Sequence, residues 1–319
     1  MTAPQSYFLI YTTGVKHVMG IIKCKDCGHE LKLDDEKCPR CGSQNRHVGI
    51  EEEIHFSDKI NSFDEAAAKD LNEFFEKNSK KVFYSKQVEV IFEKKYYHWV
   101  TNRALRALDG TILRVFEKRL KFGGRAKFYF HNSNRYFKRS VDKAAKLIDE
   151  YSEANFVAGL GQTGELLVME GFTRFGFSVL GRNTNELQGR RWTRTAHNLD
   201  FIFERDSIRY GVEVKNTLDY MDKEEFDIKI EICKELDLLP LFVNRMMPST
   251  WMEELRENDG IWMIMGYQLY PIAHKTLADK VKKELELPVD APMRLYDGTM
   301  ERLMKQHMQK VGDLKNNSR

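Results

Sequence analysis

Two runs of alternating side chains, at residues 199–204 and 208–215, constrain the fold of this chain more than any other stretch. Apolar and polar residues alternate in both runs, which is the period-two pattern of strands with one buried face. A short polar segment separates the runs, so we expect a β-hairpin with its turn at Arg205-Asp206. That turn places Asp200 opposite Gly211 and makes Glu213 its diagonal neighbour, roughly 7–8 Å away.

Three charged side chains share the polar face of this hairpin. Glu213 and Lys215 are two residues apart and therefore point to the same side of a strand, and Asp200 lies across from them. Paired carboxylates can bind a divalent cation, which neutralises a phosphodiester and generates a nucleophile from water. The pattern predicts metal-dependent phosphodiester cleavage. Glu-x-Lys alone is common on solvent-facing strands, so the prediction depends on the whole set.

The elements expected around the hairpin extend the pattern. Residues 162–172 form a helix that contains Glu165, residues 176–180 a strand, residues 223–236 an amphipathic helix, and residues 240–244 a short apolar strand. In this order the segment resembles the PD-(D/E)XK nuclease superfamily, which has the restriction-endonuclease-like fold. Type II restriction enzymes and archaeal Holliday-junction resolvases are the members nearest in character.

The resemblance implies a role for each charged residue. Asp200, Glu213 and the carbonyl of Val214 would bind Mg²⁺. Lys215 would position the attacking water, help to deprotonate it and stabilise the charge of the phosphorane. Glu165 would be the additional acid found in many members, holding a metal-bound water or a second ion.

The likeness covers about residues 160–270 and departs from the family in one place. Leu199 stands where the motif has a proline before the aspartate. Glu165 also has a second explanation, because an acid at the start of a helix is favourable helix electrostatics.

Four of the five cysteines form two CxxC pairs, each followed by glycine. Cys24, Cys27, Cys38 and Cys41 supply four thiolates for tetrahedral Zn²⁺, and the stretch resembles a zinc ribbon. No ligand position is left open, so the zinc is expected to be structural. Cysteines used in this way indicate a reducing, cytoplasmic compartment.

Residues 80–140 concentrate positive charge. They contain sixteen basic and four acidic residues, a formal charge of +12, so the remainder carries −9 within a total of +3. Helices are expected at 63–77, from Ser85 to about Tyr96 and from about Trp99 to Leu108, followed by a hairpin with a glycine tip. This order resembles a winged helix-turn-helix domain in outline. The positive field suits a nucleic acid, although a solvated basic face on a scaffold would have the same composition.

Six side chains are candidates for contacting nucleic acid. Those on the third helix could hydrogen-bond to base edges in a major groove, and those near residue 190 lie in a loop that either borders the site or is an ordinary surface loop. The six are Asn102, Arg103, Arg106, Arg125, Arg190 and Arg191.

These features predict an α/β chain in four parts. They are a zinc ribbon at 1–55, an α+β winged helix-turn-helix domain at 56–148, a restriction-endonuclease-like mixed sheet flanked by helices at 149–271, and a helical extension at 272–319. No apolar run reaches the roughly 18 residues of a membrane span. We therefore expect a cytoplasmic protein, prokaryotic or archaeal in type, without membrane contact.

The expected function is a Mg²⁺-dependent endonuclease of double-stranded DNA, sequence-specific in the manner of type II restriction enzymes. Cutting both strands would call for a homodimer with one site for each strand. The alternatives are a structure-specific nuclease of the Holliday-junction resolvase or repair type, cleavage of RNA, and a non-catalytic DNA-binding regulator on a nuclease-like scaffold.

Overall fold

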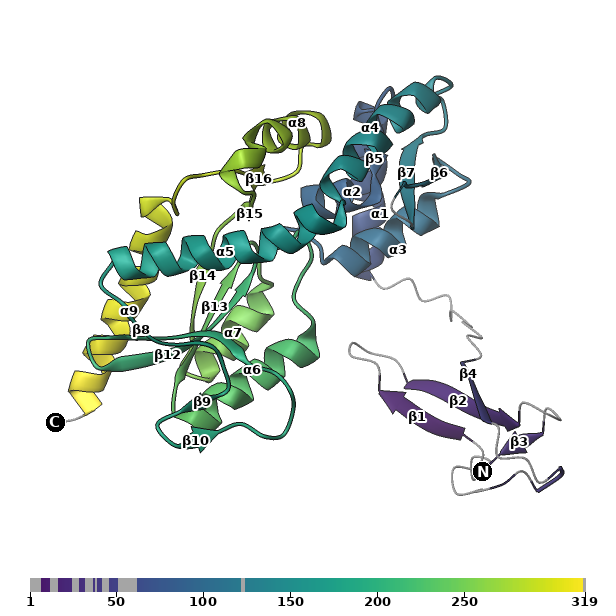
Figure 1. The fold of residues 1–319 in the computed structure, drawn as a ribbon. Coiled ribbons are helices and arrows are strands. Elements are labelled where there is room, and N and C mark those ends of the chain that lie inside the picture. Colours follow the sequence, from purple (N-terminus) through teal and green to yellow (C-terminus); the bar gives the residue numbers. More distant parts are fainter. Residues whose placement is uncertain are drawn as a thin grey trace. The chain divides into compact units, whose positions relative to one another are not determined.

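The computed structural model describes residues 7–11, 17–24, 29–31, 37, 39–41, 46–50, 62–121 and 124–317. The chain divides into two units, Met1–Lys59 and Ile60–Arg319, and each is described by itself (Figure 1). None of the described helices is both long enough and apolar enough to cross a membrane.

The described part of the first unit is a four-stranded antiparallel sheet. Its strands are β1 (Tyr7–Tyr11), β2 (His17–Cys24), β3 (Glu30–Leu31) and β4 (Arg46–Ile50). Strand β2 pairs with each of the other three. Cys24 ends β2 and Cys41 lies in an exposed turn, whereas Cys27 and Cys38 fall outside the described residues. The zinc site therefore stays a prediction.

The second unit begins with three helices and three strands. They are α1 (Ser62–Lys77), β5 (Val82–Tyr84), α2 (Ser85–Phe92), α3 (His98–Leu108), β6 (Leu113–Arg119) and β7 (Arg125–His131). The strands form an antiparallel sheet in the order β5-β7-β6. Helix α2 ends four residues before the predicted Tyr96, and β5 was not predicted. Leu71, Phe75, Val88 and Leu105 belong to the buried core of this region.

A mixed sheet of five strands follows. Its elements are α4 (Phe137–Tyr151), α5 (Ala154–Arg174), β8 (Ser178–Thr184), β11 (Leu199–Arg205), β12 (Ile208–Lys215), α6 (Lys223–Leu236), β13 (Leu239–Asn244), α7 (Ser249–Glu257) and β14 (Ile261–Ile264). The order across the sheet is β14-β13-β12-β11-β8. Strands β8, β11 and β12 are antiparallel neighbours, and β12, β13 and β14 are parallel. The predicted α/β class, with a mixed sheet flanked by helices, is confirmed.

The remaining elements are short or C-terminal. They are β9 (Glu186–Leu187), β10 (Arg190–Arg191), β15 (Gln268–Leu269), η1 (Ile272–His274), α8 (Lys275–Leu285), β16 (Val289–Asp290) and α9 (Asp297–Asn317). Strands β9 and β10 pair with each other, and β15 pairs with β16.

Helices cover both faces of the five-stranded sheet (Figure 1). Phe172 of α5 and Leu303 of α9 pack with Phe203 and Tyr210 in one buried core. Phe226 of α6 belongs to another core, with residues of β13 and α7. Strands that are buried on both faces are typical of parallel sheets with crossover helices.

Helix α9 is also bonded to the hairpin. The ring of His307 is fully buried and lies 2.9 Å from the Tyr210 hydroxyl through Nδ1 and 2.8 Å from Asp206 Oδ2 through Nε2. The C-terminal segment therefore forms part of the layer on the α5 face.

Helix α5 runs without a break through Gly159 and Gly161, whereas the predicted helix began only at residue 162. Glycine in a helix interior costs about 1 kcal/mol relative to alanine but does not stop the helix. One later glycine has a packing role, because a Cβ at Gly164 would lie 2.8 Å from the Cβ of Asn216. Asn216 is buried, and its amide bonds to the Leu160 carbonyl and to both backbone groups of Leu269. The close approach of α5 to the end of β12 therefore requires glycine.

Two alanine substitutions in α5 should have opposite effects on stability. Gly161→Ala meets nothing within 4 Å and should raise the free energy of unfolding by roughly 0.5–1 kcal/mol. Gly164→Ala collides with Asn216 and should lower it by about 1–3 kcal/mol. Urea denaturation followed by circular dichroism measures both. Equal effects of the two substitutions would contradict the packing role of Gly164.

Candidate active site

The hairpin register differs from the predicted one by one residue in the turn. Asp206-Ser207 has φ of 50° and 62°, the consecutive positive values of a two-residue hairpin turn. Ile202 therefore pairs with Gly211, and the predicted alignment of Asp200 with Gly211 is wrong. Continuing the ladder places Asp200 directly opposite Glu213. The two carboxylates are thus nearest cross-strand neighbours, not diagonal ones.

The polar face of the hairpin is covered, although it was expected to be open. Ile202 packs with Cys233 of α6 in a separate buried core, and the side chain of Glu213 is nearly inaccessible, with 4% of the residue exposed. The candidate site therefore lies between the end of the sheet and helix α6. Solvent screening is weak in such a place, so charges act strongly on one another.

Asp200 is fixed by the strand opposite. Its Oδ2 accepts a hydrogen bond of 2.7 Å from the backbone N–H of Val214. Burial raises the pKa of Asp200 above its ordinary value, although the Val214 bond lowers it, and the negative charge of Glu165 adds to the rise. Burial therefore disfavours the ionised form of Asp200, and a bound cation would stabilise that form.

Glu213 is the most perturbed carboxyl of the site. Burial, with the nearby charge of Asp200, raises its pKa to about 8. The ammonium of Lys229 on α6 lies 2.5 Å from Glu213 Oε2 and also donates to the Asn198 carbonyl. A carboxyl whose pKa lies this far above its usual range is a frequent mark of a functional site.

Lys215 is held by an acid that was not predicted. Its ammonium lies 2.7 and 2.8 Å from the two carboxylate oxygens of Glu225 on α6. Both side chains are about one-quarter exposed. Glu225 lies in the first turn of α6, where Asp222 caps the helix by accepting from the backbone N–H of Glu225 and of the residue before it. The helix therefore fixes the direction in which Lys215 points.

The sequence contained a signal for one of these two partners. Lys229 lies on the buried stripe formed by Phe226, Ile230 and Cys233, and a lysine on an apolar stripe needs a buried acceptor. Glu225 had no comparable signal, because it is an ordinary acid of a first helical turn.

Glu165 lies in the middle of α5 and not at its start, so a favourable helix terminus does not explain it. Its carboxylate is 3.5 Å from Arg182 on β8. Its charge reaches Asp200, whose pKa it raises. Helix α5 therefore brings a third acid towards the pair on the hairpin.

Asp200 and Glu213 fit a hard divalent cation, because burial disfavours the ionised form of both carboxyls, the charge of Asp200 adds to this effect at Glu213, and a cation would offset it. Val214 takes part through its N–H, and coordination by its carbonyl stays a prediction. Among the described residues, one set of three possible ligands has all its ligand atoms within 4.8 Å of one another: Glu89, His98 and Asp219. The carboxylates of Glu165, Asp200 and Glu213 do not form such a set.

In the set of Glu89, His98 and Asp219, a lysine ammonium already supplies the positive charge. The ammonium of Lys86 contacts both carboxylates. Asn102 donates a 2.7 Å hydrogen bond to Glu89 as well. These contacts connect α2 and α3 with the loop after β12, and we assign the set a structural role.

A buried ion pair fastens α2 to the site. Arg245, which directly follows β13, donates to both oxygens of Glu93 at 2.6 and 2.7 Å. Its side chain is 2% exposed, and it also bonds to the carbonyls of Thr217 and Leu218 in the loop after Lys215. Removing one member of a buried pair is strongly destabilising, so the basic region and the site are held together.

The predicted nucleic-acid contacts are mostly paired within the chain. Asn102 is bonded to Glu89, and Arg103 donates three hydrogen bonds to Asp64. Arg106 is exposed. The three arginines outside α3 are more than half exposed and form surface ion pairs, namely Arg125 with Glu117, Arg190 with Asp237 and Arg191 with Glu186.

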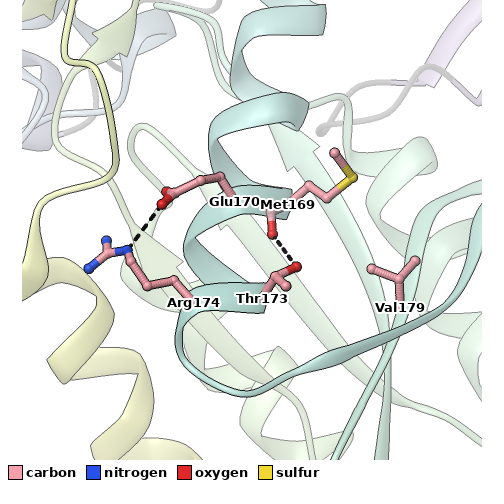
Figure 2. Close-up of a pocket in the computed structure, with 5 residues that line it drawn as sticks. All are labelled: Met169, Glu170, Thr173, Arg174 and Val179. Carbon is pink, nitrogen blue, oxygen red and sulfur yellow. Dashed lines mark hydrogen bonds and ion pairs between the residues drawn. The ribbon is translucent and has the colours of Figure 1, made fainter.

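A pocket between α5 and β8 is separate from these residues. Figure 2 shows its lining, in which Glu170 pairs with Arg174 and the Thr173 hydroxyl donates to the Met169 carbonyl. Val179 completes the lining from β8. The polar groups drawn are bonded to one another, so the pocket offers little chemistry to a ligand.

The raised pKa of Glu213 predicts how stability depends on pH. The folded protein holds the proton more tightly than the unfolded chain, whose glutamate titrates near 4.5. Stability should therefore fall as the pH rises from about 4.5 to 8, in metal-free buffer. Glu213→Gln cannot lose a proton, so its stability should depend less on pH over this range than that of the unsubstituted protein.

Thermal unfolding between pH 5 and pH 9 tests this expectation. Glu224→Gln is the matched control, because Glu224 is exposed and lies on α6 away from Glu213. Parallel pH profiles for the unsubstituted protein and Glu213→Gln would show that Glu213 ionises normally.

No family model matches the chain, and no curated protein matches it. Its function has to be argued from the geometry and charge of the site.

Proposed function

We propose that this protein is a Mg²⁺-dependent nuclease with a restriction-endonuclease-like catalytic region. The observation that carries the proposal is the pair of the half-buried Asp200 and the buried Glu213, opposite each other on adjacent strands with raised pKa values, with Lys215 two residues further on. The order α5-β8-β11-β12-α6-β13 is the one expected of that fold. A cytoplasmic location belongs to the same proposal.

The residues of the chain suit hydrolysis of a phosphodiester. Bound Mg²⁺ would neutralise phosphate charge and lower the pKa of a water molecule. Asp200 and Glu213 hold the cation position, and Asp200 is kept in orientation by the Val214 N–H. Lys215, oriented by Glu225, would align the attacking water and stabilise charge that develops on the phosphate. Glu165 would receive a hydrogen bond from water near the cation.

DNA is the proposed partner because of the basic region. Residues 80–140 carry a formal charge of +12, and the buried pair of Arg245 with Glu93 fastens this region to the loop that follows Lys215. We propose that it acts as a winged helix-turn-helix domain. A structural Zn²⁺ in the first unit and a homodimer for cutting both strands complete the proposal.

One observation favours the structure-specific alternative over sequence-specific cutting. Asn102 and Arg103 were the best candidates for reading bases, but both are bonded to acids of their own domain. Base contacts would require these bonds to break. Recognition of DNA shape does not require these two side chains to contact bases.

Loss of Lys215 should abolish cleavage. Lys215→Met removes the ammonium, and the rate at which supercoiled plasmid is cut in Mg²⁺ should fall by about 100-fold or more. Lys234→Met, on the exposed face of α6, should cut at the unsubstituted rate. A linear duplex, a four-way junction and single-stranded RNA, offered in parallel, identify the substrate. Salt-sensitive DNA binding without cleavage in any divalent ion would favour the regulator instead.

Loss of Glu225 should slow cleavage while DNA binding is preserved. Glu225→Gln leaves the Lys215 ammonium without its bidentate partner, and kcat should fall roughly 10- to 100-fold. Glu224→Gln is the neighbouring exposed control. An unchanged kcat in Glu225→Gln would show that the ion pair does not orient Lys215 during catalysis.

A further inference from the structure

A flat aromatic stack lies at the start of α3. The rings of Tyr97 and Trp99 are 4.4 Å apart and nearly parallel, with 6° between their planes. The ring of Tyr220 meets Trp99 edge-on at 6.1 Å. Trp99 nevertheless remains 47% exposed. Tyr97 covers one face of the indole, which leaves the other face as the surface on which a second ring could stack.

Contacts with α7 and with the ring of His98 hold the stack in place. The Tyr97 hydroxyl lies 3.1 Å from the Thr250 hydroxyl of α7. The buried ring of His98 stacks on Tyr220 at 4.2 Å. A side chain fixed in this way loses little conformational freedom when a ligand binds, so less of the binding free energy is offset.

The stack lies beside two features described above, the loop after Lys215 and the basic face of α3. Tyr220 follows Lys215 by five residues, in the loop that Arg245 fastens. Trp99, Arg103 and Arg106 are spaced by four and three residues and therefore share one face of α3. A polyanion lying along that face would pass over the indole.

We propose that the exposed face of Trp99 stacks on an unpaired nucleobase, and that the substrate is DNA with bases displaced from the helix, as at a bulge, branch or flap. The inference rests on the nuclease function proposed above and narrows its substrate class. Every base offers a flat π-surface to an aromatic ring, and such stacking tolerates any sequence. Bases in an intact duplex are covered by their neighbours and cannot reach the indole.

A nucleobase suits the surroundings better than an apolar protein segment does. The exposed indole shares its face of α3 with Arg103, which is paired with Asp64, and with the exposed Arg106. Protein partners are usually met by a larger apolar patch. An exposed arginine such as Arg106 beside an aromatic platform suits a phosphate next to a stacked base.

The test compares three labelled DNA duplexes: intact, with a single bulged 2-aminopurine, and with an abasic residue at the same bulge. The full chain carries Lys215→Met so that no substrate is cut. Trp99→Leu should weaken binding of the 2-aminopurine bulge by roughly 5- to 100-fold. It should leave binding of the intact and abasic duplexes unchanged. Trp99→Phe keeps a ring and should recover most of the loss.

Fluorescence of the 2-aminopurine gives an independent readout, because stacking quenches it. Quenching by the parent and its absence in Trp99→Leu are expected. Tyr136→Ala is the control, since Tyr136 is a 91% exposed aromatic away from the stack. Equal weakening of all three duplexes, no weakening, or a change only in oligomeric state would overturn the proposal. Trp99-dependent binding without Mg²⁺ cleavage by the unsubstituted protein would refute the nuclease function alone.

Discussion

Helix α6 forms two ion pairs with the charged end of β12, and in one pair the helix supplies the base while in the other it supplies the acid. Its Lys229 pairs with Glu213, and its Glu225 pairs with Lys215. An acid and a base four residues apart on the helix, Glu225 and Lys229, thus face a base and an acid two residues apart on β12, Lys215 and Glu213. Buried charges are tolerated when they are paired and hydrogen-bonded, so the site depends on the packing of α6 against the sheet.

The amphipathic pattern was sufficient to predict that helix and the charged hairpin. Residues 223–236 are helical within the predicted bounds, because the apolar stripe has a helical period and Asp222 is an effective cap. The prediction of Asp200, Glu213 and Lys215 as one group depended on strand alternation alone. Alternation fixes which face a side chain occupies, and that property was sufficient to gather the group.

The register of the hairpin and the tertiary partners of its charged residues could not be predicted from the alternation pattern. The turn at Asp206-Ser207 requires two left-handed residues, neither of them glycine, and the sequence offers no local mark of that choice. The predicted helix began after Gly159 and Gly161, because the low helix propensity of glycine is a local property and the packing that overrides it is tertiary. Burial of the charged face was missed for the same reason.

Helix α9 has a consequence for the order in which the protein can assemble. Its His307 bonds to Tyr210 and to the turn residue Asp206, and Met300 and Leu303 belong to the same core as the central strands. All five strands of the sheet precede α9 in the chain, so during translation they leave the ribosome with this face of the sheet only partly covered. Exposed apolar strands of this kind are prone to aggregate and recruit chaperones. The face of the hairpin opposite α6 thus becomes fully packed only after α9 has been synthesised.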